Sequence, residues 1–450
     1  MEFGPSETQR LFERLVRTYL GDRLPMDALH RLAKSGSGFD EQLWGGLVEL
    51  GLAGVLVPER FGGAGLGVFE AALAAEALGY FATPGPFAAA CVMAPLAILG
   101  SDSDAARAAW LPPIAQGTAR LAVVFERLAG VSGASAVMRS ANRLSGSLDG
   151  AIGLAGATHV VIVLGDHTIA VVAIEEPGVR VSLEPSLDRT RPVGKVELSD
   201  VPAELLPASD ARGRALRVLD AGRTMLAADT LGAAQNMLDR AVAYAKQREQ
   251  FGRLIGSFQA VKHMCADMVT MLEPCRALVW YAAHAQDAIP EEARLAACHA
   301  KAHLGEVGRE VARMATEAHG GMGFTDELGL HYWFKRVSAN RHLLGGPERC
   351  RQEAAALQGW GSDALLRSYS EERRPIFKET AEDFIAARIA KDGAFLARYD
   401  PRRDREEFER AWKVQTEGAT RVQTYEPNYE GSAVVAGPPQ GKCSAHGTHS

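Results

Sequence analysis

Apolar residues recur every three or four positions in two long parts of the chain, about residues 1–117 and 212–357. This spacing is typical of amphipathic helices, and it is clear in the Ala-rich run Phe69–Leu78. The second part contains four long patterns, over about residues 214–248, 258–286, 290–318 and 327–357. Because the connections between them are short, neighbouring helices should be antiparallel, and we predict a four-helix bundle.

The pattern changes between about residues 118 and 211, where short apolar runs are separated by Gly, Asp and Pro. Such punctuation is typical of antiparallel strands. The predicted strands are Leu121–Phe125, His159–Leu164, Thr168–Ile174, Val179–Leu183 and Gly194–Leu198. We therefore expect a small antiparallel β-barrel or sandwich between the two helical parts.

The remaining residues, 358–450, are more charged. We expect them to be helical over about 363–392 and loosely packed or partly disordered after about 395. The predicted fold is therefore an α+β multidomain protein: an N-terminal helical domain (1–117), a β domain (118–211), a four-helix bundle (212–357) and an extra, partly helical tail (358–450).

The segment Arg248–His263 connects the first two bundle helices. Gly252 and Gly256 allow the backbone to turn where the first helix stops. Arg248 and Phe251 are then expected to project from a constrained corner. A planar guanidinium at such a place suits a phosphate group, because it donates to two oxygens at once. The simpler interpretation is an ordinary helix-loop-helix corner with a surface arginine.

Three segments resemble the acyl-CoA dehydrogenase family, and the resemblance covers about residues 1–355. Arg248–His263 is similar to the signature R-x-Q-F-G-x-x-I-x-x-F-Q-x-V-x-H of that family. His319–Thr325, which reads HGGMGFT, follows at the expected distance, and Gly51–Gly67 resembles a stretch of the family's N-terminal helical domain. The family's order of helical domain, β domain and helical bundle agrees with the predicted fold.

The resemblance implies FAD as cofactor, an acyl-CoA thioester as substrate and electron-transfer flavoprotein as electron acceptor. It implies an oligomer in which a neighbouring subunit completes each FAD site, and a role in fatty acid or steroid degradation. By position, the cofactor-binding residues are Arg248, Phe251, Gln259, Glu317, Gly320 and Gly321. Glu317 stands where the family usually has Gln, and its carboxylate would repel a pyrophosphate.

The resemblance also locates the catalytic base, a Glu that removes the substrate's α-proton. The family places it at one of two positions, and here they are Gly345 and Gly222, the latter directly before Arg223, a predicted substrate-pocket residue. A glycine cannot take a proton. Glu348 and Asp220 are weak substitute candidates, and we expect each to be a solvated surface carboxylate.

The β domain departs from the family as well. The segments that usually contact the flavin ring read Val124–Gly130 and Ile152–Gly156 here, without the expected hydroxyl and aromatic groups. Two hypotheses follow. The chain is an acyl-CoA dehydrogenase whose base has moved, or it is a non-catalytic subunit that assembles with a paralogous acyl-CoA dehydrogenase. Losing a general base typically costs about 10²–10⁴-fold in rate, so the second hypothesis fits the double glycine better.

The tail carries a different resemblance. Leu365–Pro375 and Tyr425–Ser432 are similar to the C-terminal part of the flavin domain of aromatic-ring hydroxylases, which are FAD monooxygenases. The phosphate-binding Gly-x-Gly-x-x-Gly loop of that domain is absent. We therefore interpret the tail as a fusion remnant. A flavin-dependent ring hydroxylase is a third hypothesis, based on the tail alone.

Composition adds four expectations. The net charge of −6 and the pI of about 6.1 give no general attraction to nucleic acid. The six cysteines are scattered without a Cys-x-x-Cys pair, so we expect reduced thiols and no metal site. No apolar run is long enough to span a bilayer, and the N-terminus lacks the apolar core of a signal peptide. We expect a cytoplasmic protein without membrane contact.

Overall fold

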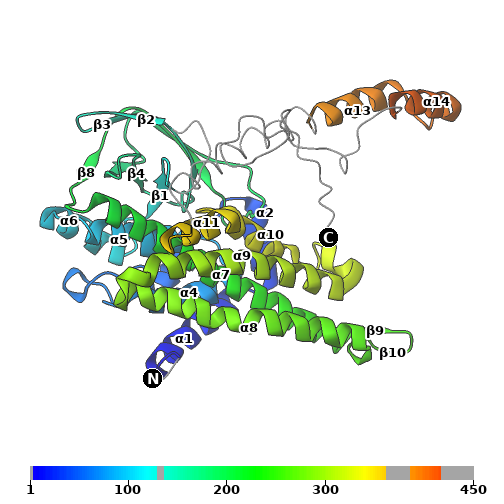
Figure 1. The fold of residues 1–450 in the computed structure, drawn as a ribbon, viewed down its shortest axis with the longest axis horizontal. Helices are drawn as coiled ribbons and strands as arrows, with labels where there is room; N and C mark the ends of the chain where they lie inside the picture. Colours follow the sequence, from blue (N-terminus) through cyan, green and yellow to red (C-terminus); the bar gives the residue numbers. More distant parts are fainter. Residues whose placement is uncertain (1–3, 129–135, 361–385, 417–450) are drawn as a thin grey trace. The chain divides into compact units, whose positions relative to one another are not determined.

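The structure is a computed structural model that describes residues 4–128, 136–360 and 386–416. The chain divides into two compact units, Met1–Ala354 and Ala355–Ser450. The first unit contains a helical part, a β part and a second helical part in that order (Figure 1). This order of elements confirms the predicted α+β architecture.

The N-terminal part is helical, as predicted. Its segments are α1 (Glu7–Arg23), α2 (Met26–Ser35), α3 (Glu41–Glu49), the 3-10 turn η1 (Glu59–Phe61), α4 (Val68–Tyr80), the π-helix η2 (Ala88–Met93), α5 (Ala94–Leu99) and α6 (Asp104–Ala115). Helix α4 crosses the long helix α7 (Ala211–Ala245) at two glycines. A Cβ on Gly79 would lie 2.0 Å from the Asp229 carbonyl oxygen, and one on Gly232 1.8 Å from that of Glu76. Only glycine allows the two helices to approach so closely.

The β part forms two four-stranded sheets. Its strands are β1 (Leu121–Phe125), β2 (Ala136–Ser140), β3 (Arg143–Ala151), β4 (His159–Val163), β5 (Ile169–Ala173), β6 (Val179–Leu183), β7 (Gly194–Pro202) and β8 (Glu204–Leu206). One sheet has the order β1-β4-β5-β8 and the other β2-β3-β7-β6. Apolar side chains from both sheets share one core, which includes Val124, Leu148 and Val196. The structure thus has two packed sheets where a barrel or a sandwich was predicted.

The prediction of purely antiparallel strands is wrong for one pair. Strands β1 and β4 are parallel, with Leu121 opposite His159 and Phe125 opposite Val163. Between them the chain leaves the first sheet, forms the β2–β3 hairpin in the second and returns. Such a crossover permits a parallel pair, whereas a short hairpin would have forced an antiparallel one.

The second helical part contains the predicted bundle. Its helices are α7, α8 (Gln259–Ala288), α9 (Pro290–His319), α10 (His331–His342) and α11 (Pro347–Leu357). The single fourth helix predicted over 327–357 is wrong, because the chain breaks between α10 and α11. Leu344 and Gly345 both have left-handed backbone angles, with φ of 57° and 96°. Pro347 follows after Gly346 and begins α11, and a proline disfavours helical backbone at the residue before it.

A buried polar network joins the three parts of the first unit at α7. Its side chains are Asp188, Thr190 and Arg191 from the β6–β7 loop, Asp229 from α7, and Arg336 and Asn340 from α10. Arg336 is fully buried and donates to both aspartates and to the carbonyl oxygens of Ala82 and Thr83 in the N-terminal part. Burial alone would raise the pKa of Asp188, but the Arg336 and Arg191 cations hold it below its usual value. Because its charges are paired, the network fixes how the three parts pack.

The described part of the second unit contains α13 (Ala387–Arg398) and α14 (Arg405–Thr416). The expectation of a loosely packed or partly disordered chain after about residue 395 stays a prediction, although residues 405–416 form helix α14. The Phe395 ring lies 5.5 Å from the ring of Phe408 and 5.2 Å from that of Trp412, measured between centroids. These aromatic contacts hold the two helices together. The predicted helix over 363–392 falls mostly outside the described residues.

Candidate functional site

The predicted corner between α7 and α8 is a tight hairpin. Two short strands, β9 (Glu249–Gln250) and β10 (Arg253–Leu254), pair antiparallel around Phe251 and Gly252. Both tip residues have positive φ, 55° and 74°, which is the geometry of a type I′ turn. The glycine suits this turn, but a phenylalanine in left-handed backbone is strained by about 1–2 kcal/mol.

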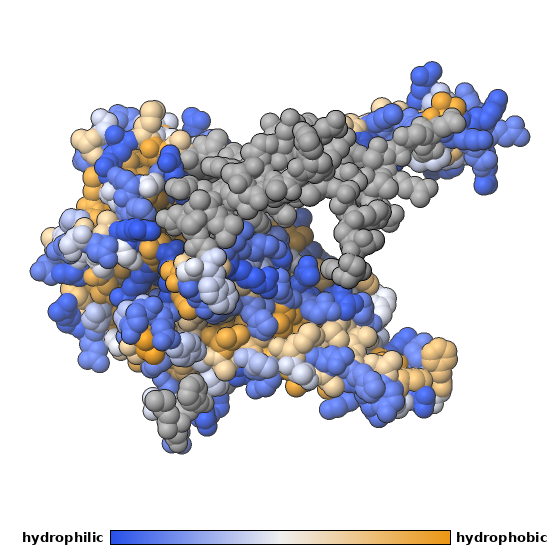
Figure 2. Space-filling view, viewed as in Figure 1, coloured by the Kyte–Doolittle hydropathy of each residue, from blue (hydrophilic) through white to orange (hydrophobic). Residues whose placement is uncertain are grey.

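The side chains of this corner face away from the chain's own core. Phe251 is 92% exposed, and Leu254 is 40% exposed beside it. Figure 2 shows the apolar surface at this end of the bundle, over α8 and the hairpin. Arg248 is also exposed, and it forms no ion pair with any carboxylate in the described part of the chain. The corner therefore presents an exposed aromatic ring on strained backbone beside a guanidinium that has no ionic partner among the described residues.

The predicted diglycine lies at the same end of the bundle. The ring of His319, the last residue of α9, is 4.7 Å from that of Tyr244 near the end of α7. Gly320 and Gly321 follow, and a Cβ added to either would meet nothing within 4 Å. The structure therefore brings the corner and the diglycine to one end of the bundle, with open space at both glycines.

Two other predicted cofactor residues lie at this end. Gln259 is exposed at the first turn of α8. Glu317 lies in the last turn of α9, with its side chain 49% exposed, and forms an ion pair with Arg313. The Arg313 cation partly offsets the negative charge that Glu317 would present to a pyrophosphate.

The two glycines at the predicted base positions lie close together, away from the corner. Gly222 is in α7, and Gly345 is in the loop between α10 and α11. A Cβ on Gly222 would come within 2.7 Å of Leu344, the residue before Gly345, and within 2.8 Å of Met93. The space that a glutamate at 222 would need is therefore filled by two apolar side chains. At Gly345 the φ of 96° would strain any other residue. A carboxylate at 222 would therefore require the ends of the Leu344 and Met93 side chains to move, and one at 345 would lie on strained backbone.

Arg223 is fully buried behind these glycines. Its guanidinium donates to Glu353 on α11, over 2.7 and 3.1 Å, and to the Leu344 carbonyl oxygen over 2.9 Å. Asp220 lies 3.4 Å away on the same helix. Burial raises the pKa of Asp220 to about 7, although Arg223 opposes this. Arg223 thus serves internal partners in this structure.

The expectation that both substitute carboxylates are solvated is wrong for Asp220, which is only 3% exposed. The i, i+3 pairing with Arg223 draws it into the interior. Glu348 agrees better, because its side chain is 43% exposed and pairs with Arg341 over 2.9 Å. Each carboxylate has a cationic partner of its own.

The two β-domain segments compared with the flavin-contacting strands lie next to each other. Val123 and Ile152 exchange backbone hydrogen bonds of 2.9 and 3.0 Å. Glu126 is buried, and its carboxylate accepts from the backbone N–H groups of Val137 and Gly165. Residues 129–135, which include Gly130, lie outside the described residues. In the described part of these segments the side chains are mostly apolar.

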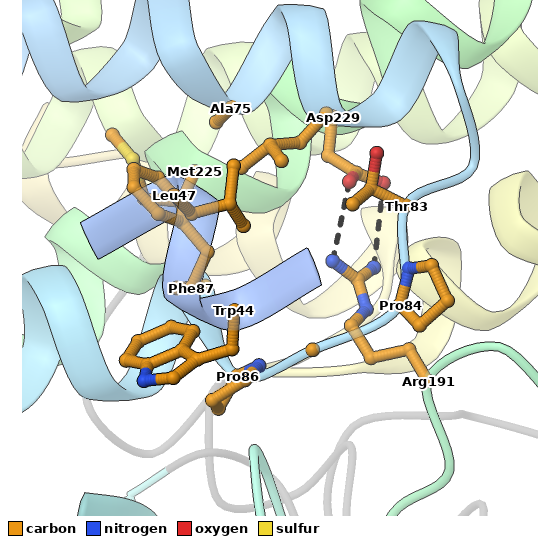
Figure 3. A pocket seen from close by; sticks show the side chains of 13 residues that line it. Trp44, Leu47, Ala75, Thr83, Pro84, Pro86, Phe87, Arg191, Met225 and Asp229 are labelled. Carbon is orange, nitrogen blue, oxygen red and sulfur yellow. Dashed lines mark hydrogen bonds and ion pairs between the residues drawn. The ribbon is translucent and has the colours of Figure 1, made fainter. Parts of the chain in front are cut away.

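A narrow pocket is lined in part by Met225 and Asp229 of α7 (Figure 3). These residues follow Gly222 at i+3 and i+7, so the pocket lies on the face of α7 that carries Gly222. Trp44 and Phe87 form apolar walls, and the ion pair between Asp229 and Arg191 lies at one side. Its enclosed space is about 20 Å³, enough for roughly one water molecule. An acyl group would need these side chains to move apart.

Comparison with known proteins assigns the family. The description "Acyl-CoA dehydrogenase, N-terminal domain" matches residues 6–118, and "Acyl-CoA dehydrogenase, C-terminal domain" matches residues 212–359. Acyl-CoA dehydrogenase IpdE2 of Mycolicibacterium smegmatis is 31% identical over 76% of this chain and 96% of its own length. The chain belongs to the acyl-CoA dehydrogenase family. Its function is accordingly acyl-CoA dehydrogenase-like.

Solved structures of this family have the same fold. A variant of the Tcur3481-Tcur3483 steroid ACAD has a TM-score of 0.71 and 31% identity, covering 78% of this chain and 98% of that one. The ChsE4-ChsE5 complex of Mycobacterium tuberculosis has a TM-score of 0.73 and 25% identity, covering 80% and 100%. Each of these two is named as a pair of proteins.

The sequence analysis missed the polar cluster around Arg223. This cluster contains Asp220, Arg223, Cys298, Lys301, Cys350 and Glu353. One signal was available, since Cys350 and Glu353 lie three residues apart and so share a helix face.

No group of three or more His, Cys, Asp or Glu side chains suited to a metal occurs among the described residues. None of the helices in the described ranges has the length and hydrophobicity needed to cross a membrane.

Proposed function

We propose that this chain takes part in the FAD-dependent α,β-dehydrogenation of an acyl-CoA thioester and lacks a catalytic glutamate of its own. Bound FAD would supply the acceptor for the substrate's β-hydride. The residues of this chain that would hold the adenine dinucleotide are Arg248, Phe251, Gln259, Gly320 and Gly321. The observation that carries the proposal is the exposed corner and diglycine at one end of the bundle.

The residues at this end fit a dinucleotide. Gly320 and Gly321 leave room for close backbone approach. The Arg248 guanidinium, which has no ionic partner among the described residues, suits a pyrophosphate, and the exposed ring of Phe251 suits an adenine or an apolar partner surface. The mostly apolar strands of the β domain offer the flavin ring few polar contacts. We infer that the chain contributes the dinucleotide side of a site that a second subunit completes.

The second candidate function is that of a partner subunit in a hetero-oligomeric acyl-CoA dehydrogenase. The observation that favours it is that both base positions are glycines, with Leu344 and Met93 packed against Gly222 and a positive φ at Gly345. A relocated base is less favoured, because Asp220 and Glu348 already pair with arginines. The paired names of the Tcur3481-Tcur3483 and ChsE4-ChsE5 structures are consistent with such an assembly.

We propose electron-transfer flavoprotein as the electron acceptor. The name of one relative, the caffeyl-CoA reductase-Etf complex subunit CarC of Acetobacterium woodii, refers to such a complex. The substrate would be a fatty acyl-CoA or a steroid acyl-CoA. The Tcur3481-Tcur3483 protein is described as a steroid ACAD, which supports testing steroid thioesters first.

The test is to purify the chain alone and together with a paralogous acyl-CoA dehydrogenase subunit. For each preparation we would record the visible flavin spectrum and acyl-CoA oxidation with an artificial electron acceptor. We expect the chain alone to be inactive, and the pair to be yellow and active. A yellow, active preparation of the chain alone would reject the partner-subunit function.

Variants at the corner test the cofactor role. Phe251→Ala should weaken flavin retention by the pair about tenfold, in the range of an exposed aromatic anchor at an interface. Met138→Ala is the matched control, because Met138 is 74% exposed on strand β2 of the β domain. Equal retention in both variants would remove Phe251 from the site.

The hydroxylase resemblance of residues 358–450 stays a prediction. The segments that carry it, Leu365–Pro375 and Tyr425–Ser432, lie outside the described residues. We propose that the tail is a fusion remnant without its own flavin. NAD(P)H oxidation in the presence of phenols is the assay that would contradict this.

A further inference from the structure

Two cysteines face each other beside the loop between α10 and α11. Cys298 is on α9 and Cys350 on α11, both are fully buried, and they belong to one small cluster of buried side chains. The Cys350 sulfur lies 3.7 Å from the Gly345 carbonyl oxygen, and the Cys298 sulfur lies 3.4 Å from Nη1 of Arg223. The pair therefore contacts both the loop that carries Gly345 and the arginine behind Gly222.

The charges around this pair favour a thiolate. The cations are Arg223, Arg294, Lys301 and Arg349, and the carboxylates are Asp220 and Glu353. The neighbouring Cys298 thiol, together with the Arg223 and Lys301 cations, lowers the pKa of Cys350 despite its burial. A thiolate next to a second thiol is the arrangement that reacts to a disulfide.

The other described cysteines lack this environment. Burial raises the pKa of Cys91 and of Cys265, and it raises that of Cys275 to about 11. Cys265 is nevertheless the only one of the five described cysteines that is not fully buried. If exposure alone decided reactivity, Cys265 would react first. It therefore serves as a control within the same chain.

Helix α11 must open locally to admit a small reagent, and this opening also breaks the ion pairs of Glu353 with Arg223 and Arg294. It packs on α9 through a satellite cluster of four small buried residues, Cys298, Ala302, Cys350 and Ala354, which is separate from the main core. Elements held by small apolar clusters open at a lower free energy than the core. Opening of α11 would expose Cys350 without unfolding the bundle.

We propose that Cys298 and Cys350 form a reversible disulfide site that ties α11 to α9 beside the loop carrying Gly345. The oxidant is a small peroxide. The Cys350 thiolate attacks one peroxide oxygen, which breaks the O–O bond and leaves a sulfenic acid and hydroxide. The Cys298 thiol then attacks the sulfenic sulfur, forming the S–S bond and releasing water. Overall, two thiols and one hydrogen peroxide give one disulfide and two waters.

The disulfide changes what holds the loop. In the disulfide, Cys350 has no S–H group to donate to the Gly345 carbonyl oxygen, while Lys301 Nζ still donates to that oxygen over 3.0 Å. The crosslink replaces a weak contact by a covalent one, so that local opening of α11 is suppressed. We expect backbone amides of α11 to exchange at least tenfold more slowly in the oxidised protein.

The test treats the full-length chain, carrying Cys443→Ser to remove the cysteine at residue 443, with hydrogen peroxide, followed by iodoacetamide. A non-reduced digest is then analysed by mass spectrometry. We expect a crosslinked peptide that contains Cys298 and Cys350, while Cys265 carries the iodoacetamide label. Oxidation of Cys265 with Cys298 and Cys350 left as thiols would overturn the proposal, and so would a crosslink between two chains.

Two variants assign the reacting sulfur. In Cys298→Ser the Cys350 sulfenic acid has no resolving thiol, and a dimedone adduct should accumulate at Cys350. In Cys350→Ser no adduct should form at Cys298. Adducts of equal yield at both positions would show that the thiols react without the proposed order. Because the crosslink is measured in a chain with both cysteines intact, poor folding of either variant leaves the main test decisive.

Discussion

The corner at the α7–α8 hairpin and the region around Gly222 lie along the same helix α7 but have opposite characters. At the corner, Phe251 is exposed and strained and Arg248 has no ionic partner in the described residues. Around Gly222 the space is filled, and Arg223 has a full set of buried partners. The contrast supports the proposal that the chain keeps the surface of a shared cofactor site while it lacks the reacting carboxylate.

The strongest way to break this comparison is to remove the main partner of Arg223. Glu353→Ala should destabilise the protein by about 3–5 kcal/mol, because it leaves a fully buried guanidinium without its bidentate acceptor. The measurement is the urea midpoint and slope of the purified chain, followed by circular dichroism.

Glu348→Ala is the control for Glu353→Ala. It removes a carboxylate from the same helix α11, but Glu348 is half-exposed and pairs with Arg341 at the surface. Its loss should cost no more than about 1 kcal/mol. If both variants lose the same amount of stability, the region around Arg223 is not the tightly paired cluster that the structure describes.

The second prediction concerns the closed base position. Gly222→Glu should destabilise the protein by about 1–3 kcal/mol and should not create dehydrogenase activity, because Leu344 and Met93 already fill the space. The matched control is Gly45→Glu in α3, where an added Cβ meets nothing within 4 Å and the glycine is helical. Adding Met93→Ala to Gly222→Glu should recover part of the stability. A Gly222→Glu protein that is stable and oxidises acyl-CoA would contradict the closure.

Much of the open end could be predicted from the sequence. Phe251, Gly252 and the diglycine stand in short segments, and local backbone requirements determine their geometry, so the signature also indicates the turn. Helical periodicity located α7, α8 and α9, because a face packed on a core repeats every 3.6 residues. Strands β2 and β3 were not predicted, because their exposed and polar residues form no apolar run.

The closed end could not be predicted in the same way, because its partners are far apart in the sequence. Arg223, Cys298 and Glu353 come from three helices and meet only after the bundle has packed. We expected Asp220 to be a surface carboxylate, because a single sequence does not reveal whether a helix is buried on all of its faces. The break before α11 depends on positive φ at Leu344, a residue type that rarely signals it.

The third prediction uses the pKa of Asp220, which is about 7 in the folded chain against an ordinary value of 3.8. Between pH 4 and 6 the folded state keeps a proton that the unfolded state releases. The contribution of Asp220 to stability is therefore full below about pH 4 and is lost as the pH rises towards 7, by up to about 1.4 kcal/mol per pH unit.

Asp220→Asn cannot titrate, so its stability should fall less with pH than that of the unmodified chain. Urea unfolding of both proteins at pH 4, 5 and 6 measures the difference, with all other groups in common. The range ends at 6, below the Asp220 pKa of about 7. Parallel stability curves would mean that Asp220 is ionised in the folded protein at all three values.

The smallest expected effect is at the open end. Glu317→Gln removes a half-exposed negative charge three residues before Gly320 and installs the residue that the family usually has there. Flavin affinity of the complete assembly should improve about two- to fivefold at low salt and less at high salt, because surface charges are screened.

Glu310→Gln is the control, since Glu310 pairs with the same Arg313 but lies seven residues, about 10 Å, further from the end of α9 that precedes Gly320. Flavin fluorescence titrations at two salt concentrations measure both variants. If the two improve affinity equally, the gain comes from net charge or from Arg313, and the diglycine end of α9 does not face the pyrophosphate.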